Sequence, residues 1–175
     1  HDLLRQYSKG IIALSACIQG EVPQYILQDN MEGARRAVEW YIETFGKDNF
    51  FLEIQNHGLP EELRAQQVLC QLADEYGLGI VASNDFHYVM KDDADAQDIR
   101  VCIQTGRRRA EVDRLKFPND EFYLKSGDEM AELFGHIPGA LENTVKIADR
   151  CNVEFNFDEH HLPHFDVPEG ETSKT

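Results

Sequence analysis

The chain has 175 residues, of which 42% are hydrophobic and 28% charged, as expected for a globular domain with a core. Acidic residues outnumber basic ones by 32 to 17. The resulting net charge of −15 argues against a surface that grips a nucleic-acid backbone. No apolar run approaches the roughly 20 residues of a membrane span, and no signal peptide is visible. The four cysteines have no paired spacing, so we expect a reducing, cytoplasmic setting and no membrane partner.

Three apolar runs predict strands, at residues 11–15, 50–54 and 80–82. The first run is continuous, which is typical of a strand buried on both faces. Helical spacing of apolar residues, with proline, asparagine, aspartate or glycine at the ends, predicts helices at 22–27, 30–46, 60–77 and 92–106. The alternation of strands and helices indicates an α/β fold with parallel strands and outer helices.

The pattern changes after Gly106. The basic cluster at 107–109 is interpreted first as an exposed helix end and second as a phosphate site. Short helices are expected from Gly127 and from Pro138. Residues 1–155 are expected to form the domain portion and residues 156–175, which lack a helical period, a linker or arm. Because the chain starts without methionine and ends in a polar tail, we expect an excised piece.

Side chains of metal-binding types follow each predicted strand. Cys17 follows the first strand, Glu53 and His57 lie in and after the second, and Asp85 and His87 follow the third. In parallel α/β folds the carboxyl ends of the strands share one edge, so we expect a polar or metal site there. Extended backbone would place residues 85 and 87 on one face, about 6.5–7 Å apart. Thiolate, carboxylate and imidazole all bind zinc.

Each of these residues also has a simpler interpretation. Cys17 is often a small buried hydrophobic residue, Glu53 could pair with a basic neighbour, and His57 could end a turn. Asp85 could cap a turn. The convergence of three strands on one edge favours the shared site over these alternatives. The histidines outside the strand ends are interpreted as non-ligands: His136, His160, His161 and His164.

Several blocks of sequence, taken in order, resemble one known family. They are residues 10–17 (GIIALSAC), 51–58 (FLEIQNHG), 82–88 (ASNDFHY), 102–106 (CIQTG), 121–126 (EFYLKS) and 148–153 (ADRCNV). Together they resemble the later part of the N-terminal polymerase and histidinol phosphatase (PHP) domain in the bacterial DNA polymerase III alpha subunits, a family of replicative polymerases. Residues 162–165 and 167–170 resemble the lead-in to the polymerase palm.

The resemblance implies that the chain forms part of a distorted (β/α)7 PHP barrel. Where the family keeps its metal site, the last three ligands match Cys17, Asp85 and His87. Glu53 and His57 match recurrent family positions, and we expect them beside the ligands rather than among them. The family's earlier ligands and its polymerase aspartates have no counterpart in this sequence, so no catalytic residue is expected here.

Two functions of different class follow from the resemblance. In the first, the chain is scaffold within a DNA-directed DNA polymerase, a nucleotidyltransferase that uses Mg²⁺ and DNA. Its expected partners are a proofreading exonuclease subunit, the sliding clamp and the clamp loader. In the second, the PHP domain is a metal-dependent phosphoesterase or 3′–5′ exonuclease. Cys17 favours zinc at one position, since Mg²⁺ avoids thiolate. Alone, the chain is expected to bind metal weakly and to be inactive.

Overall fold

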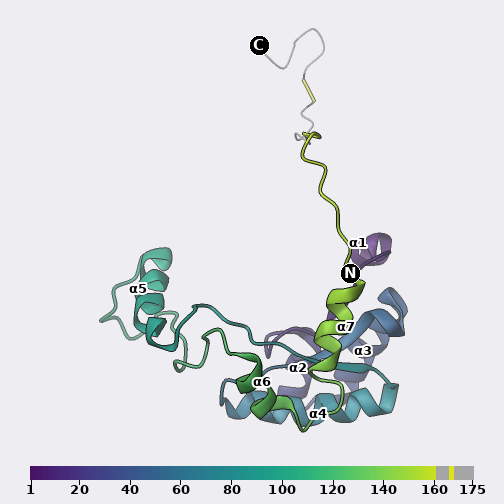
Figure 1. Ribbon diagram of the computed structural model, residues 1–175, viewed down its shortest axis with the longest axis horizontal. Coiled ribbons are helices and arrows are strands. Elements are labelled where there is room, and N and C mark those ends of the chain that lie inside the picture. Colours follow the sequence, from purple (N-terminus) through teal and green to yellow (C-terminus); the bar gives the residue numbers. More distant parts are fainter. Residues whose placement is uncertain (161–165, 168–175) are drawn as a thin grey trace.

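The computed structural model describes residues 1–160 and 166–167, and Figure 1 shows their arrangement. The strands are β1 (Ala13–Leu14), β2 (Phe50–Ile54) and β3 (Gly79–Ala82). The α-helices are α1 (Asp2–Tyr7), α2 (Glu21–Leu27), α3 (Met31–Phe45), α4 (Pro60–Tyr76), α5 (Ala94–Thr105), α6 (Gly127–Phe134) and α7 (Glu142–Arg150). Single 3-10 turns, η1 (Lys47–Asn49) and η2 (Lys91–Asp93), precede β2 and α5. None of the helices described is long and apolar enough to cross a membrane.

The strands form one parallel sheet in the order β1-β2-β3. Ala13 pairs with Phe50, and Phe51 pairs with Gly79, so the carboxyl ends of the strands lie along one edge. Helices α2 and α3 connect β1 to β2, and α4 connects β2 to β3. This arrangement confirms the α/β class and is consistent with part of a (β/α) barrel.

The helix boundaries follow residues that satisfy or remove free backbone groups. The side chain of Asn30 accepts a hydrogen bond of 2.9 Å from a backbone N–H in the first turn of α3. Pro60 begins α4, where its missing N–H leaves no bond unmade. Gly77 ends α4 in the left-handed region, with φ of 60°. Ser126 and Glu129 form a capping box at the start of α6.

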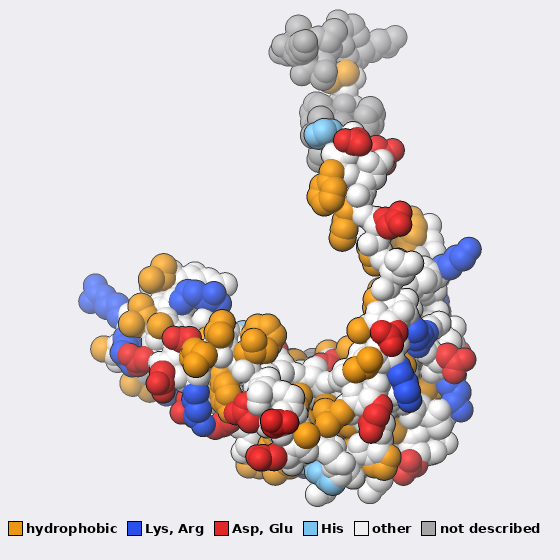
Figure 2. All heavy atoms as spheres, in the orientation of Figure 1, with side chains coloured by type: hydrophobic (Ala, Val, Ile, Leu, Met, Phe, Trp, Pro, Cys, Tyr) orange, Lys and Arg blue, Asp and Glu red, His pale blue; other side chains and the backbone are white. Residues whose placement is uncertain are grey.

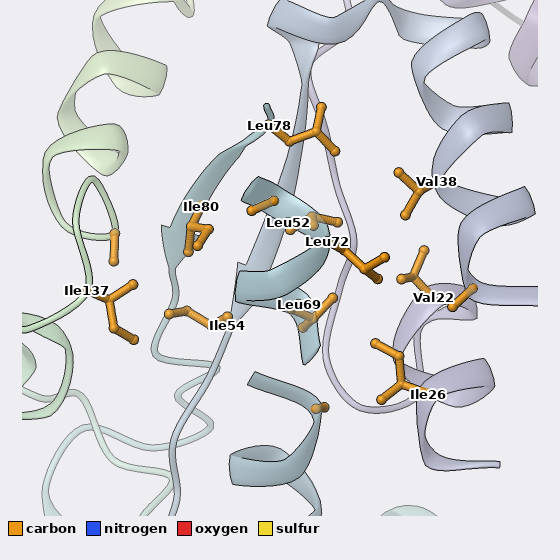
Figure 3. Packing of buried hydrophobic residues seen from close by; sticks show 14 of the residues in the cluster. Val22, Ile26, Val38, Leu52, Ile54, Leu69, Leu72, Leu78, Ile80 and Ile137 are labelled. Atoms are coloured by element: carbon orange, nitrogen blue, oxygen red, sulfur yellow. The ribbon is translucent and has the colours of Figure 1, made fainter. Parts of the chain in front are cut away.

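The core lies between the sheet and helices α2, α3 and α4 (Figure 3). Leu52 and Ile54 of β2 share this cluster with Leu69 and Leu72 of α4, and all four side chains are at most 2% exposed. Burial of each such side chain contributes about 1.5–3 kcal/mol. The cluster extends to other elements through Val22, Ile26, Val38 and Ile137. The sheet and its three helices are therefore fixed relative to one another, which positions the carboxyl edge.

The outer edge of β3 is covered by the segment between α6 and α7 together with the first turn of α7. The Ala82 N–H donates to the Ala140 carbonyl at 2.9 Å, and the Asn143 side chain donates to the Ile80 carbonyl at 2.7 Å. Backbone groups that would otherwise be free on this edge are thus satisfied, and the edge is blocked to another strand. The helix expected from Pro138 begins later, at Glu142. Residues 137–140 instead form a turn, and the Ala140 carbonyl of this turn contacts β3.

Strand β1 is shorter than predicted, with two residues in place of five. Leu14 is 39% exposed and Ile11 is 43% exposed, so the prediction of a strand buried on both faces is wrong. The physical reason is position. Strand β1 ends the sheet with β2 as its neighbour, and the face that carries Leu14 is only partly covered. Helix α1 also has no counterpart among the predicted elements.

Two parts of the molecule extend from this body. Helix α5 lies away from the sheet, and residues 156–160 run outward beyond α7 as exposed chain (Figure 1). Figure 2 shows the hollow between these two arms, with hydrophobic side chains along it. Val145 and Phe155 are 61% and 76% exposed, which is high for residues of their type.

Candidate functional site at the carboxyl edge of the sheet

A hydrogen-bonded network of polar side chains connects the ends of the three strands. The hydroxyl of Ser15, directly after β1, accepts from the Glu53 N–H at 2.8 Å. The Glu53 carboxylate accepts from the Gln55 amide at 3.1 Å and from the Ser83 hydroxyl. Gln55 also donates to Ser83 at 3.0 Å. Among the described residues Glu53 makes no ion pair, so the alternative in which it pairs with a basic neighbour is wrong.

The loops after β1 and β3 hold non-glycine residues in the left-handed backbone region. Ala16 has φ of 64° and Asp85 has φ of 46°. This conformation costs roughly 1–2 kcal/mol for an L-residue and persists only where the surroundings fix it. Gly20 closes the first loop tightly, since a Cβ there would lie 2.2 Å from the Ser15 carbonyl oxygen. Both loops are therefore candidates for function rather than simple connections.

Asp85 and His87 lie side by side after β3. Nε2 of His87 is 3.4 Å from Oδ1 of Asp85, and the side chains are 37% and 38% exposed. The His87 N–H donates to the Phe122 carbonyl at 2.8 Å, and its ring contacts Phe117 with centroids 4.6 Å apart. The expected geometry of an extended strand is wrong, because the left-handed backbone at Asp85 makes a turn. An adjacent, accessible carboxylate and imidazole can still bind a cation together.

Cys17 is half-buried in the loop after β1 and lines a small cavity with Glu53 and Glu62. The cavity measures about 10 Å³, which is room for about one water molecule. The side-chain oxygen of Gln66, which also lines it, has no hydrogen-bond partner. Across residues 1–160 and 166–167, no three His, Cys, Asp or Glu side chains are grouped so as to hold a metal ion. The thiol is therefore not grouped with the pair after β3.

His57 makes a buried contact that connects three segments. Its Nδ1 is 2.6 Å from one carboxylate oxygen of Glu62, and its backbone N–H donates to the other at 2.6 Å. The two side chains are 1% and 4% exposed. Nε2 of His57 is 2.8 Å from the carbonyl oxygen of Asn84. Both ring nitrogens face acceptors, so both contacts are hydrogen bonds when the ring carries two protons and Glu62 balances its charge.

The electrostatics of Glu62 agree with this assignment. Burial raises the pKa of the Glu62 carboxyl, but hydrogen bonds from the His57 ring and backbone outweigh burial and leave that pKa below its ordinary value. No sequence pattern indicates a role for Glu62, and the patterns predict His57 only as the end of a turn or a neighbour of the ligands. The available signal was a histidine followed five residues later by a glutamate in the first turn of a helix that begins with Pro60.

The extended segment before α6 closes over His57 and the loop after β3. The Phe122 ring stacks on the His57 ring with centroids 4.0 Å apart and an interplanar angle of 9°. The Asn84 side chain accepts from the Lys125 N–H at 2.7 Å and donates to the Tyr123 carbonyl at 3.1 Å. Asn84 is thus held through its backbone by His57 and through its side chain by this segment. The residue that immediately precedes Asp85 is fixed from two sides.

The basic cluster after α5 has carboxylate partners. Arg107 pairs with Glu111 at 3.1 Å, and Arg109 pairs with Asp95. All three arginines are exposed and follow the carboxyl end of α5, which supports the interpretation of 107–109 as an exposed helix end. Helix α5 ends at Gly106 in the left-handed region, with φ of 65°.

The remaining histidines lie outside the network at the carboxyl edge. His136 and His160 are exposed. In the described part of the chain, neither belongs to a group of three His, Cys, Asp or Glu side chains that could hold a metal ion. His161 and His164 lie outside the described residues.

Comparison with known proteins adds a family context. Residues 1–57 match the model of the PHP domain. The chain is 43% identical over 173 residues to DNA polymerase III subunit alpha of Treponema pallidum (strain Nichols), across 99% of this chain and 15% of that protein. It is 44% identical over 168 residues to the subunit of the same name from Borreliella burgdorferi, across 95% and 15%. With the Thermus aquaticus subunit it shares 42% identity over 179 residues, across 98% and 14%.

The matched part is a similar share of each relative. The chain spans about 15% of the length of the relatives that it matches, so the similarity concerns one segment of a longer protein. The match to the PHP domain falls at the start of that segment and includes β1 and β2. Over nearly its whole length, the chain is similar in sequence to one segment of DNA polymerase III subunit alpha, the same family that its sequence blocks resemble.

Proposed function

We propose that this chain functions as part of a bacterial DNA polymerase III alpha subunit, whose complete form carries out template-directed DNA synthesis in the cytoplasm. The observation that carries the proposal is the 43% identity to a subunit of that name over 99% of this chain. DNA would be held mainly by other regions, because the net charge of this chain is −15. The expected partners of the complete subunit are a proofreading exonuclease subunit, the sliding clamp and the clamp loader.

Within that protein, residues 1–155 would act as PHP scaffold and residues 156–175 as a linker toward the polymerase region. Three features support a scaffold: the apolar core under the sheet, the blocked edge of β3 and the buried pair of His57 with Glu62. Each fixes one segment of the chain against another. We assign no nucleotidyl-transfer role to any residue of this chain, and the chain alone should not extend a primer.

A divalent metal is the group that a PHP domain would hold at the carboxyl edge. The sequence favours zinc because of the Cys17 thiol, but in the structure this thiol lies apart from the pair of Asp85 and His87. Asp85 and His87 fit such an ion, because they are adjacent and partly exposed. Cys17 would be a third donor, but it lines a separate small cavity, so the described residues group two donors rather than three. A bound ion would supply Lewis acidity toward a phosphoester or water. Mg²⁺ would serve the polymerase reaction elsewhere in the protein.

Glu53 and His57 would position these donors without binding the ion. His57 holds the Asn84 carbonyl at 2.8 Å, immediately before Asp85, and thereby helps to fix the left-handed backbone there. Glu53 holds Ser83 and Gln55, which fixes the chain where it leaves β3.

The test uses the complete polymerase that contains this segment, as wild type and as Asp85→Asn. The wild type should extend a primed template with deoxynucleotides, and the variant should retain extension within about twofold, because Asp85 is assigned to the scaffold. Metal content by elemental analysis should fall in the variant. Asp92→Asn, at another exposed aspartate, is the matched control and should change neither property. A wild-type protein without primer extension would contradict the proposal.

A second candidate function is a metal-dependent phosphoesterase or 3′–5′ exonuclease activity of the same edge. The observation that favours it is the accessible pair of Asp85 and His87 beside a left-handed backbone turn. The same proteins would be assayed for nucleotide release from a labelled 3′ end with Mn²⁺ or Zn²⁺. Hydrolysis lost at least 100-fold in Asp85→Asn but kept in Asp92→Asn would support this activity. Absence of hydrolysis by the wild type would contradict this second function and leave the scaffold role as the only one proposed.

A further inference from the structure

A cavity of about 320 Å³ opens beside His87, between α5 and the chain that follows it. Its walls include Arg100 and Gln104 of α5 and Lys116 and Phe117 of the later segment. It is much larger than the cavity beside Cys17, and it reaches the exposed pair at the end of β3 through His87. A volume of this size lies at the lower end of the range for small-molecule sites.

The charge of this cavity is opposite to that of the protein. Its lining contains the cations Arg100 and Lys116 and no carboxylate, whereas the whole chain has a net charge of −15. Nearby arginines are already engaged: Arg109 with Asp95, and Arg114 with Asp98 at 2.5 Å. Within the described part of the chain, Arg100 and Lys116 make no ion pair.

A neighbouring cavity differs from this one in that its lining contains carboxylates. That second cavity, of about 260 Å³, shares Lys116 and Phe117 as wall residues but is lined by Asp95 and Asp98. Its arginines are neutralised by those carboxylates, so it offers little attraction to an anion. Arg100 lines only the cavity beside His87, whereas Lys116 lines both cavities and lies close enough to Asp98 to help lower the pKa of that carboxyl. Both cations border the cavity beside His87, where they can bind an anion.

The other lining groups suit a nucleobase better than an inorganic ion. Phe117 presents an aromatic ring that is supported by Phe122, with centroids 4.8 Å apart. Gln97 is 6% exposed and Gln104 is exposed, and each amide offers a donor and an acceptor. Nucleic-acid ends are commonly bound by stacking on an aromatic ring, amide contacts to base edges and cations at the phosphate.

We infer that this cavity binds one nucleotide at the end of a DNA strand, with its phosphate against Arg100 and Lys116 and its base against Phe117. The inference rests on the proposed function, since a phosphoester held here would lie beside His87 and the donor pair after β3. The inference gives Arg100 of α5 a role in phosphate binding, which the arginines at 107–109 are not expected to have. The arm that carries α5 would be a nucleotide-binding element, and Figure 2 shows both basic and acidic side chains on that arm.

The experiment is a titration of the full chain, in the presence of EDTA, with deoxyadenosine monophosphate, inorganic phosphate and deoxyadenosine, followed by NMR chemical shifts. Deoxyadenosine monophosphate should bind most tightly. Arg100→Gln and Lys116→Gln should each weaken its binding at least tenfold, the loss expected when one charge-assisted hydrogen bond is removed. Phe117→Leu should weaken deoxyadenosine monophosphate at least threefold and leave the affinity for phosphate unchanged.

The matched control is Arg108→Gln, which removes an equal charge from the same arm outside the cavity lining. Binding within twofold of wild type in this control supports the site. An equal loss in the control and in Arg100→Gln would mean non-specific charge attraction and would overturn the inference. Equal affinity for deoxyadenosine and its monophosphate would also overturn it. Unfolding curves of each variant should match the wild type, and Lys116→Gln gives a second variant if Arg100→Gln unfolds.

The outcome is separable from the proposed metal function. EDTA removes divalent ions, so nucleotide binding in this assay does not depend on Asp85 and His87 holding a metal. If the complete protein lacks primer extension but this cavity binds the nucleotide, the proposed function fails and the site stands. The opposite pair of results would leave the function and overturn the site.

Discussion

The carboxyl edge of the sheet holds two pairs of a carboxylate with an imidazole, and they differ in almost every physical respect. The pair of His57 with Glu62 is at most 4% exposed, with its closest atoms 2.6 Å apart. The pair of His87 with Asp85 is more than one-third exposed, at 3.4 Å. The buried pair uses both ring nitrogens and both carboxylate oxygens in protein contacts. The buried pair therefore has no ring nitrogen or carboxylate oxygen left to bind a ligand, whereas the exposed pair remains accessible to one.

The difference in burial also determines how much free energy of unfolding is lost when one partner of a pair is removed. A buried charge whose partner is removed is left unpaired in a medium that solvates it poorly, so the loss is several kcal/mol. An exposed pair is screened by water and contributes about 0–1 kcal/mol. We therefore expect substitutions at the buried pair to change stability and substitutions at the exposed pair to change binding.

The largest effect is expected for Glu62→Ala. His57 would lose its carboxylate partner while its Nε2 stays next to the Asn84 carbonyl, and the free energy of unfolding should fall by about 3–5 kcal/mol. Urea denaturation followed by circular dichroism measures this change. Glu61→Ala is the matched control, because Glu61 is exposed in the same helical turn, and it should fall within about 0.5 kcal/mol of wild type. Similar losses in both variants would contradict the prediction that the buried pair of His57 with Glu62 stabilises the fold.

A smaller loss is expected for Asn84→Ala, which removes one acceptor and one donor between the loop after β3 and the segment before α6. The Lys125 N–H and the Tyr123 carbonyl would lose their bonds of 2.7 Å and 3.1 Å. We expect a loss of about 1–3 kcal/mol, the usual penalty for a polar group left unpaired. Asn152→Ala, at an exposed residue after α7, is the control. A loss no greater than in this control would mean that the segment is held by Phe122 packing alone.

The pH dependence of stability sharpens the same comparison. The pKa of Glu62 lies below its ordinary value in the folded protein, so the stability that this carboxylate contributes is present above the unfolded-state pKa of about 4.3. It is lost as the pH falls through the lower folded-state pKa. Wild type should therefore exceed Glu62→Gln in stability at pH 6, and the gap should narrow as the pH is lowered below 4. Urea midpoints at each pH give the gap, and a gap that stays constant would contradict the assignment.

Sequence patterns were sufficient for the parts of the fold that depend on local signals. Asn30, Pro60 and Gly77 bound α3 and α4 where the capping rules put them. The end of β1 was less predictable, because exposure of Leu14 depends on whether another element covers that face, which an apolar run cannot reveal. The parallel order of the strands followed from their alternation with helices.

At the site, sequence spacing identified the residues but could not predict the directions in which their side chains point. Residues 85 and 87 were expected on one face of a strand, yet the left-handed turn at Asp85 sets their contact. Cys17 lies three residues beyond β1, after a left-handed Ala16, so the direction of its thiol could not be read from the strand. The contact between His57 and Glu62 spans a turn and a helix start, where neither strand nor helix periodicity relates two side chains.

The smallest effect on stability is expected for Asp85→Asn. Asparagine keeps the size of the side chain and tolerates the left-handed region as well as aspartate does, so φ of 46° is not a new source of strain. The lost partner is an exposed imidazole at 3.4 Å, and the free energy of unfolding should change by less than about 0.5 kcal/mol. Isothermal titration with Zn²⁺ should nevertheless show weaker binding to the variant than to wild type, with Asp92→Asn as control. A variant that lost stability on the scale expected for Glu62→Ala would show that the exposed pair, too, is structural, and the division between the two pairs would fail.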